Sequence, residues 1–346
     1  MRNKKIKRTL RIVFIMASIG SLAFVPWILV KAWILPPPDS IQEQAEEAVS
    51  HGFDGVIVYV DEAGKPPAFY GAGWHNRDAK IPANPHALFK IASISKLYVA
   101  VAITKLVKAE RLSLDETLAQ YFPELVGRIE NAEKITLRMM VQHRSGIPNY
   151  TDYPGFWVEQ PSDRLEALEF ALDLPANFEP GEDYGYSNTN YLLLRELIKK
   201  VVGYSHDQYI REEILIPLGL KNTFGSVNEV SNMDDVMSGY YVGFEEDLKT
   251  DDRGMLATAQ DVGTFLRALN DGSVFDEGEQ EIYSSIYVYE HTGLVPGYQS
   301  IAKYHKDIDT VIIQFTSTTD FEGYEWNLSE IVYGRVLKLV RRQRGA

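Results

Sequence analysis

The chain has 346 residues, of which 45% are hydrophobic, enough for a large core in one domain or two closely joined ones. It has no cysteine, which excludes disulfides, thiolate metal sites and a cysteine nucleophile, and its seven histidines form no HExxH pair, so neither a metal nor another cofactor is expected. The net charge is −13, and because the first 38 residues contribute +7, residues 39–346 carry −20, an acidic balance that argues against nucleic-acid binding.

The first 38 residues are predicted to anchor the chain in a membrane. Six basic residues precede an uncharged run of 19 residues, 12–30, which is just long enough to cross a bilayer. The positive-inside rule then predicts a single-pass cell-membrane protein with a short cytoplasmic end and an extracytoplasmic body. Pro36-Pro37-Pro38 should end the helix and act as a stiff spacer. A cleaved signal peptide is the alternative, because Ser21-Leu22-Ala23 is a small-x-small site, but the apolar run continues to Leu35 and favours an uncleaved anchor.

Residues 39–346 are predicted to form one domain of the α+β class. Helical spacing or capping residues predict helices at 41–50, 93–109, 163–172, 190–202, 258–269 and 327–339. β-branched and alternating runs predict strands at 55–60, 68–74, 286–290, 298–304 and 310–315. Because the strands lie near both ends of this segment, we expect an antiparallel sheet built from both chain ends, with a helical domain inserted between them.

Ser93-Ile94-Ser95-Lys96 is the first candidate for chemistry. A serine nucleophile needs a partner that removes its proton, and a lysine three residues along a helix lies on the same face. The following residues, 97–106, are almost entirely apolar, so the helix should be buried and the pKa of Lys96 lowered towards that of a useful base. A second Ser-x-x-Lys, Ser300 to Lys303, lies in a predicted strand, where positions three apart point to opposite faces, and is discarded.

Two further motifs lie downstream of Ser93, and each is a weak signal when it is taken alone. Tyr186-Ser187-Asn188 precedes a predicted helix, and its phenol and amide, two residues apart, can face one cleft; alone, it is better explained as a capping loop. His291-Thr292-Gly293 follows a predicted strand, where the glycine would let a substrate lie against the strand edge and the other two side chains would engage a carboxylate; alone, it is no better than a turn.

Together, the three motifs resemble the serine β-lactamase and penicillin-binding protein superfamily, in particular the branch with Tyr-x-Asn and His-Thr-Gly that includes D-alanyl-D-alanine carboxypeptidases and related esterases. The resemblance extends from Ile41 to the carboxyl end. It includes supporting stretches at 141–148, 218–223 and 254–261, in which His143 is assigned a structural role.

By that resemblance, Ser93 forms an acyl-enzyme, and Lys96 and Tyr186 share the proton transfers, with the main base left open. Asn188 orients the substrate, and His291 and Thr292 hold the carboxylate side. Gly293 gives access to the strand, and the backbone amides of Ser93 and Leu294 hold the oxyanion. A histidine at 291, where β-lactamases usually have lysine, lowers the expectation of efficient lactam hydrolysis. The expected partner is a cell-wall peptide or another small acyl substrate, and the oligomeric state is left open.

We expect a D-alanyl-D-alanine carboxypeptidase-like peptidase that acts on cell-wall peptides, with three rival functions to weigh against it. An α/β-hydrolase would need a G-x-S-x-G elbow, and the chain has none. A β-lactamase or small-ester esterase would use the same residues as a peptidase. A non-catalytic penicillin sensor would also become acylated, but it would not release the product.

Overall fold

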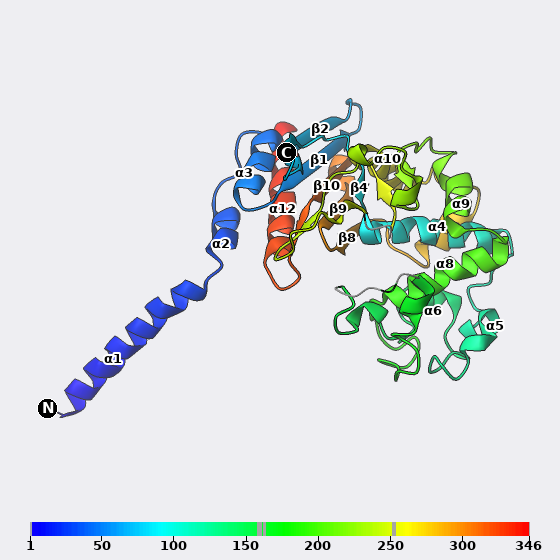
Figure 1. Ribbon diagram of the computed structural model, residues 1–346, viewed down its shortest axis with the longest axis horizontal. Coiled ribbons are helices and arrows are strands. Elements are labelled where there is room, and N and C mark those ends of the chain that lie inside the picture. Colours follow the sequence, from blue (N-terminus) through cyan, green and yellow to red (C-terminus); the bar gives the residue numbers. More distant parts are fainter. Residues whose placement is uncertain (1, 158–160, 162–163, 251–253, 346) are drawn as a thin grey trace.

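The computed structural model describes residues 2–157, 161, 164–250 and 254–345. Its centre is a six-stranded antiparallel sheet in the order β3-β2-β1-β10-β9-β8 (Figure 1). The strands are β1 Gly55–Glu62, β2 Ala68–Asn76, β3 Ile81–Pro82, β8 His291–Val295, β9 Tyr298–His305 and β10 Thr310–Thr316. The amino-terminal hairpin therefore pairs with the carboxyl-terminal strands through β1 and β10, which confirms the α+β class and the sheet built from both chain ends.

Both faces of the sheet are covered, which explains why β1 is buried on consecutive residues. Val56, Val58 and Val60 face a core with α3 (Ile41–Ser50) and α12 (Glu325–Gln343). Ile57 and Tyr59 point to the opposite face and belong to the larger core that contains the central helices. Alternation along a strand divides its side chains between the two layers, so one short strand links both cores.

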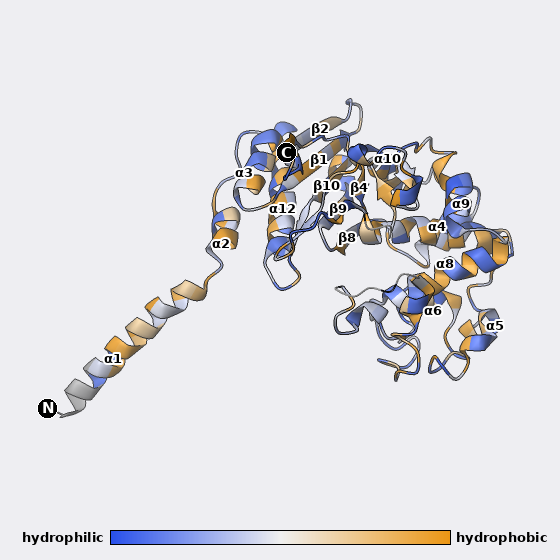
Figure 2. Ribbon diagram, in the orientation of Figure 1, coloured by the Kyte–Doolittle hydropathy of each residue, from blue (hydrophilic) through white to orange (hydrophobic). Residues whose placement is uncertain are grey.

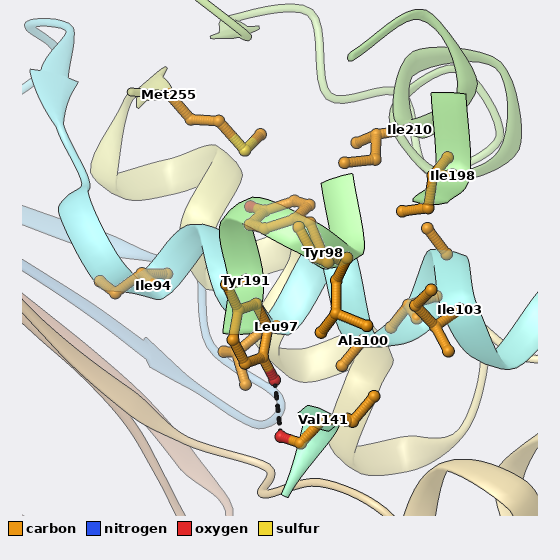
Figure 3. Close-up of a cluster of buried hydrophobic side chains, with 14 of the residues drawn as sticks. Ile94, Leu97, Tyr98, Ala100, Ile103, Val141, Tyr191, Ile198, Ile210 and Met255 are labelled. Carbon is orange, nitrogen blue, oxygen red and sulfur yellow. Dashed lines mark hydrogen bonds between the residues drawn. The ribbon is translucent and has the colours of Figure 1, made fainter. Parts of the chain in front are cut away.

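The helical part of the molecule lies beside the sheet and is built around α4 (Figures 1 and 3). Its helices are α4 Ser95–Lys108, α5 Leu118–Tyr121, α6 Leu137–Val141, α7 Arg164–Leu168, α8 Asn188–Val202, α9 His206–Ile210, α10 Ala259–Asp271 and α11 Glu279–Ser284. Two small sheets complete it, β4 Phe89–Lys90 with β7 Leu256–Ala257 and β5 Thr223–Phe224, and the parallel pair β6 Tyr240–Tyr241 with β11 Thr318–Thr319.

Two predicted elements differ in the structure. Residues 286–290 form no strand, because backbone amides of Ile286 and Tyr287 donate to the carbonyl of Tyr283 and close the end of α11. The side chains of Ile286, Tyr287 and Tyr289 pack into or against the core, whereas Val288 is exposed, and the strand begins only at His291. The helix predicted at 163–172 is shorter, α7 Arg164–Leu168, and residue 163 lies outside the described residues.

The predicted single membrane helix is interrupted. Helix α1 (Arg2–Ser21) continues through a 3₁₀ turn to Phe24, and α2 (Trp27–Ile34) follows at an angle of 79°. Val25 is extended before Pro26, which cannot donate a backbone hydrogen bond, so the helix breaks there. Among the described residues, no single helix has both the length and the apolarity to cross a bilayer, although this bent pair passes the same test together. Figure 2 shows its apolar residues along α1 and α2, with α1 extending away from the body.

Candidate active site

Ser93 lies on a 3₁₀ turn, Ala92–Ile94, directly before α4. The residues of α4 from Ser95 to Leu106 are all buried, as the apolar run predicted, and they pack against α8 and its neighbours (Figure 3). Lys96 is in the first turn of this helix and is only 3% exposed. The buried helix thus fixes the backbone that carries both side chains.

The first two sequence motifs meet at Ser93. Its Oγ lies 2.7 Å from the Tyr186 hydroxyl and 3.0 Å from Lys96 Nζ. Lys96 Nζ also donates to Asn188 Oδ1 over 2.8 Å. Ser187, between the tyrosine and the asparagine, points away into the core and is 1% exposed, so Tyr186 and Asn188 face the same cleft as the sequence predicted.

The environment shifts the two titratable groups in opposite senses. Burial, with a smaller contribution from the positive charge of Arg195, holds the pKa of Lys96 well below its usual value. Arg195 is fixed nearby because its guanidinium donates to Ser95 Oγ over 2.9 Å. Burial raises the pKa of Tyr186 to about 12, against a smaller opposing effect of its hydrogen bond to Ser93. Lys96 is therefore suited to accept a proton, and Tyr186 to keep one.

The amide of Asn188 is oriented by two residues that the sequence reasoning missed. Asn149 Oδ1 accepts from the backbone amide of Asn188 over 2.9 Å, and Asn188 Nδ2 donates to Thr151 Oγ1 over 3.2 Å. This arrangement directs Asn188 Oδ1 towards Lys96. A signal was available, since Asn149 directly follows the stretch 141–148 that supports the family resemblance.

His143 supports the loop that carries Tyr186. Its Nδ1 accepts from the backbone amide of Ser187 over 3.2 Å, and its ring stacks on Tyr186 with centroids 4.5 Å apart and on Tyr191 at 5.0 Å. Burial, then the charges of Lys96 and His291, lower the pKa of His143 to about 3. His143 is thus neutral at ordinary pH and contacts the loop through packing and one hydrogen bond.

The third motif opens β8, the edge strand of the sheet. Gly293 faces the turn that carries Ser93, because a Cβ at this glycine would lie 2.3 Å from Ser300 Oγ, 2.5 Å from the carbonyl of Ile91 and 2.9 Å from Ala92 Cβ. The absence of a side chain therefore lets the nucleophile turn pack on β8. This differs from the expectation that the glycine would give a substrate access to the strand.

His291 was expected to help hold a substrate carboxylate, and in the structure both of its ring nitrogens are engaged by neighbouring groups. Its Nδ1 donates to the Thr292 carbonyl over 2.5 Å, so Nε2 of the neutral ring is free to accept from the Tyr287 hydroxyl, 3.0 Å away. Burial, and then the positive charge of Lys96, lower the pKa of His291 to about 4. With both nitrogens engaged and the ring neutral, His291 has no proton to offer a carboxylate.

A cavity of about 520 Å³ joins these elements. Seven of the predicted residues line it, namely Ser93, Lys96, Tyr186, Asn188, His291, Thr292 and Leu294. Gly293 does not line it, and Ser300 of the discarded motif is buried, with its hydroxyl donating to the carbonyl of Ile91 over 3.0 Å. Three large aromatic residues, Phe156, Trp157 and Trp326, also line the cavity.

The comparison with protein families agrees with this geometry. The model of the Beta-lactamase family matches residues 39–286, more than half of the chain, and ends before His291. Protein flp of Staphylococcus aureus (strain MW2) is 30% identical over 201 residues, which cover 56% of this chain and 40% of that protein. The chain thus aligns with about two-fifths of the length of this curated relative.

Solved structures show the same fold over nearly the whole chain. The D-amino acid amidase of Ochrobactrum anthropi SV3, in complex with L-phenylalanine amide, superposes with a TM-score of 0.76 at 23% identity, covering 88% of this chain and 98% of the amidase. A penicillin-binding protein of Bacillus halodurans gives a TM-score of 0.73 at 20% identity, covering 87% and 100%. From its matched residues and its fold, the chain belongs to the β-lactamase family of serine hydrolases, within the superfamily of serine β-lactamases and penicillin-binding proteins.

Proposed function

We propose that this serine hydrolase is anchored in the membrane and cleaves cell-wall peptides or related D-amino acid amides through an acyl-enzyme on Ser93. The contact that carries the proposal is the convergence of Tyr186 and Lys96 on Ser93 Oγ, at 2.7 and 3.0 Å. A nucleophile within hydrogen-bond reach of a base that is itself held by a third group is the arrangement that covalent catalysis needs. Here Asn188 is the third group.

The protonation states of Lys96 and Tyr186 suggest different roles for the two groups in catalysis. Neutral Lys96 takes the Ser93 proton as Oγ bonds to the substrate carbonyl carbon, while one of its own N–H groups stays on Asn188. The amides of Ser93 and Leu294 are proposed to hold the oxyanion, since the nucleophile turn packs on β8 at Gly293. When the carbonyl–nitrogen bond breaks, Tyr186 gives its proton to the leaving nitrogen and recovers one from Lys96. Water then releases the acyl group by the reverse sequence.

A second substrate class is favoured by His291. In a carboxypeptidase the leaving group is a free amino acid with a carboxylate, which a cation stabilises. His291 is neutral and has both nitrogens occupied, so the β8 side of the cleft suits a leaving group without a carboxylate, such as an amino acid amide or the ammonia of a primary amide. The D-amino acid amidase with the same fold supports this candidate only by analogy.

The anchor is proposed from the amino-terminal sequence. Basic residues precede an apolar run, and α1, α2 and the 3₁₀ turn between them expose large apolar side chains, among them Phe14, Phe24 and Trp33. Because water disfavours such surface, a lipid environment would account for it. Intact mass of the membrane fraction tests this, and a mature chain that begins near Phe24 would instead indicate a secreted enzyme.

The experiment for the substrate uses mass spectrometry of the intact protein with three probes: a fluorescent penicillin, a D-Ala-D-Ala peptide and the same peptide with a terminal amide. We expect an adduct on Ser93 that decays with release of product, absent in Ser93→Ala and retained in Ser300→Ala. Faster turnover of the acid than of the amide supports the carboxypeptidase, and the opposite order supports the amidase. A penicillin adduct that persists, with neither peptide cleaved, would contradict both and indicate a sensor.

A further inference from the structure

Arg335, on α12 of the catalytic domain, is buried at 4% exposure and does not line the cleft. Its Nε donates to Gln44 Oε1 over 2.6 Å, and its Nη2 forms an ion pair with Glu47 Oε2 at 2.7 Å. Nη1 donates to the carbonyls of Ala32 and Leu35 over 2.8 and 2.7 Å, and Nη2 also donates to the carbonyl of Pro36 over 3.2 Å. A guanidinium has five N–H donors, so this set accounts for all of them.

These bonds tie the segment next to the anchor to the enzyme. The carbonyls of Ala32 and Leu35 lie at the end of α2, where a helix leaves acceptors without intrahelical partners and where positive charge is favourable. Ala32 is 1% exposed in the core shared with α12. Further along, Arg342 Nη2 donates to the carbonyls of Pro38 and Asp39 over 2.9 and 3.0 Å. The proline spacer is therefore bound along its length to α12.

The opposite side of α2 is apolar and open. Trp33 is 74% exposed, Ile34 67% and Trp27 49%. Lys31 is exposed on the same helix. Tryptophan beside lysine, directly after an apolar helix, is the composition of a segment at the level of lipid headgroups. A cavity of about 500 Å³ opens beside α2, with Trp33 and Lys338 among its lining residues.

The bend between α1 and α2 gives this surface its direction. The apolar stretch from Thr9 to Phe24 is about 24 Å long at ~1.5 Å per residue, close to the ~30 Å of a hydrocarbon core. With that stretch across the bilayer, an angle of 79° lays α2 nearly parallel to the membrane plane. The Trp27 indole donates to the carbonyl of Leu22 over 2.9 Å and closes the bend.

We propose that α2 lies on the extracytoplasmic lipid surface as an interfacial helix, and that Arg335 clamps it to the catalytic domain, so that the domain keeps one orientation above the bilayer. The inference rests on the proposed membrane anchor. If this segment were released completely from α12 and unfolded, the 15 residues from Val25 to Asp39 would form a tether with a root-mean-square reach of about 20 Å. With the clamp, the cleft stays at a fixed height and angle over the membrane.

The test uses the full chain in vesicles of phosphatidylcholine and phosphatidylglycerol. Because the chain has no cysteine, Trp33→Cys accepts one spin label, and Glu133→Cys, at an exposed position of the helical part, accepts one fluorescent donor. We expect the label at 33 to be more accessible to oxygen than to a water-soluble nickel chelate. The donor at 133 should show a narrow distribution of distances to acceptor lipids.

The clamp is tested by Arg335→Met, which should broaden that distance distribution. Its matched control is Arg341→Met on the same helix, since Arg341 makes an exposed ion pair with Asp307; this variant should leave the distribution narrow. Ala32→Gln perturbs the contact from the α2 side and should broaden it as Arg335→Met does. Acylation of Ser93 in every variant reports whether the catalytic domain is folded.

A broad distribution in the unmodified chain, or a narrow one in both Arg335→Met and Ala32→Gln, would overturn the clamp. A label at position 33 that is exposed to the nickel chelate, or shielded from both reagents by a second copy of the chain, would overturn the lipid contact. Failure of the anchor itself is recognised separately, as unmodified protein that does not float with vesicles, and would remove the basis of this inference.

Discussion

Gly293→Ala tests whether the nucleophile turn depends on close packing against β8. The added Cβ would lie 2.3 Å from Ser300 Oγ and 2.5 Å from the carbonyl of Ile91, where ordinary contacts are 3.4–4 Å. The serine can rotate away, but the backbone carbonyl of Ile91 cannot move without displacing the turn that carries Ser93. Overpacking of this kind costs about 1–3 kcal/mol.

Two measurements follow from that displacement. The melting temperature should fall by about 1–5 °C, because the unfolding entropy of a domain of about 300 residues is on the order of 0.6 kcal/mol/K. Acylation by a fluorescent penicillin, followed by stopped flow, should slow by about 100-fold, because a shift near 1 Å is enough to misplace a nucleophile. Adding Ser300→Ala removes the nearest contact and should restore only part of the rate, since the clash with Ile91 remains.

The control is Gly334→Ala on α12, where a Cβ would meet nothing within 4 Å. That change should leave acylation unaltered and should not lower the melting temperature, because alanine favours the helix by about 0.5–1 kcal/mol. Wild-type acylation and melting temperature in Gly293→Ala would refute the packing argument.

The remaining predictions concern protons and orientation. Lys96→Met should reduce kcat/KM by ~10²–10⁴-fold and remove the limb of the pH profile on which activity rises with pH, because the pKa of Lys96 is held well below its usual value; an unchanged limb would assign it to another group. Between pH 5 and 8, His291, with a pKa of about 4, should stay neutral, so KM for acidic and amidated substrates should vary in parallel. Tyr287→Phe removes the hydroxyl that donates to Nε2 of His291, so the imidazole should protonate more easily and the two KM curves should diverge at low pH. Curves that already diverge in the wild type would contradict a neutral His291. Asn149→Ala removes the acceptor of the backbone amide of Asn188, so kcat should fall by about 2- to 10-fold while the melting temperature stays nearly constant. A lower melting temperature with an unchanged kcat would indicate that Asn149 has a purely structural role.

Local patterns in the sequence determined much of the fold. The helix at 41–50 and the strands starting at 55, 68, 298 and 310 begin where the structure has them, because each has a capping residue or an alternating run that acts over a few neighbours. The apolar run after Lys96 predicted a buried helix, and with it the lowered lysine pKa. One local signal was overlooked: Pro26 lies inside the apolar run and breaks it.

Other features depend on contacts between distant segments. The sequence shows that residue 291 is a histidine, but it does not show that the ring is neutral. The neutral state follows from burial beside Lys96 and from the hydrogen bond of the Tyr287 hydroxyl. Likewise, the sequence predicts only that Gly293 lies at a strand. It does not reveal the close packing against Ile91 and Ala92, which come from the other half of the domain.

The sequence by itself therefore determined which residues could react, because the three-residue spacing of Ser93, on the 3₁₀ turn, and Lys96, in the first turn of α4, needs no other part of the chain. Tertiary structure alone decided that Tyr186 and Asn188 reach them, that His291 is neutral, and that Arg335 binds the spacer after the anchor. The physical reason is that burial and hydrogen bonding depend on which segments surround a side chain, and those segments are up to about 300 residues away along the chain.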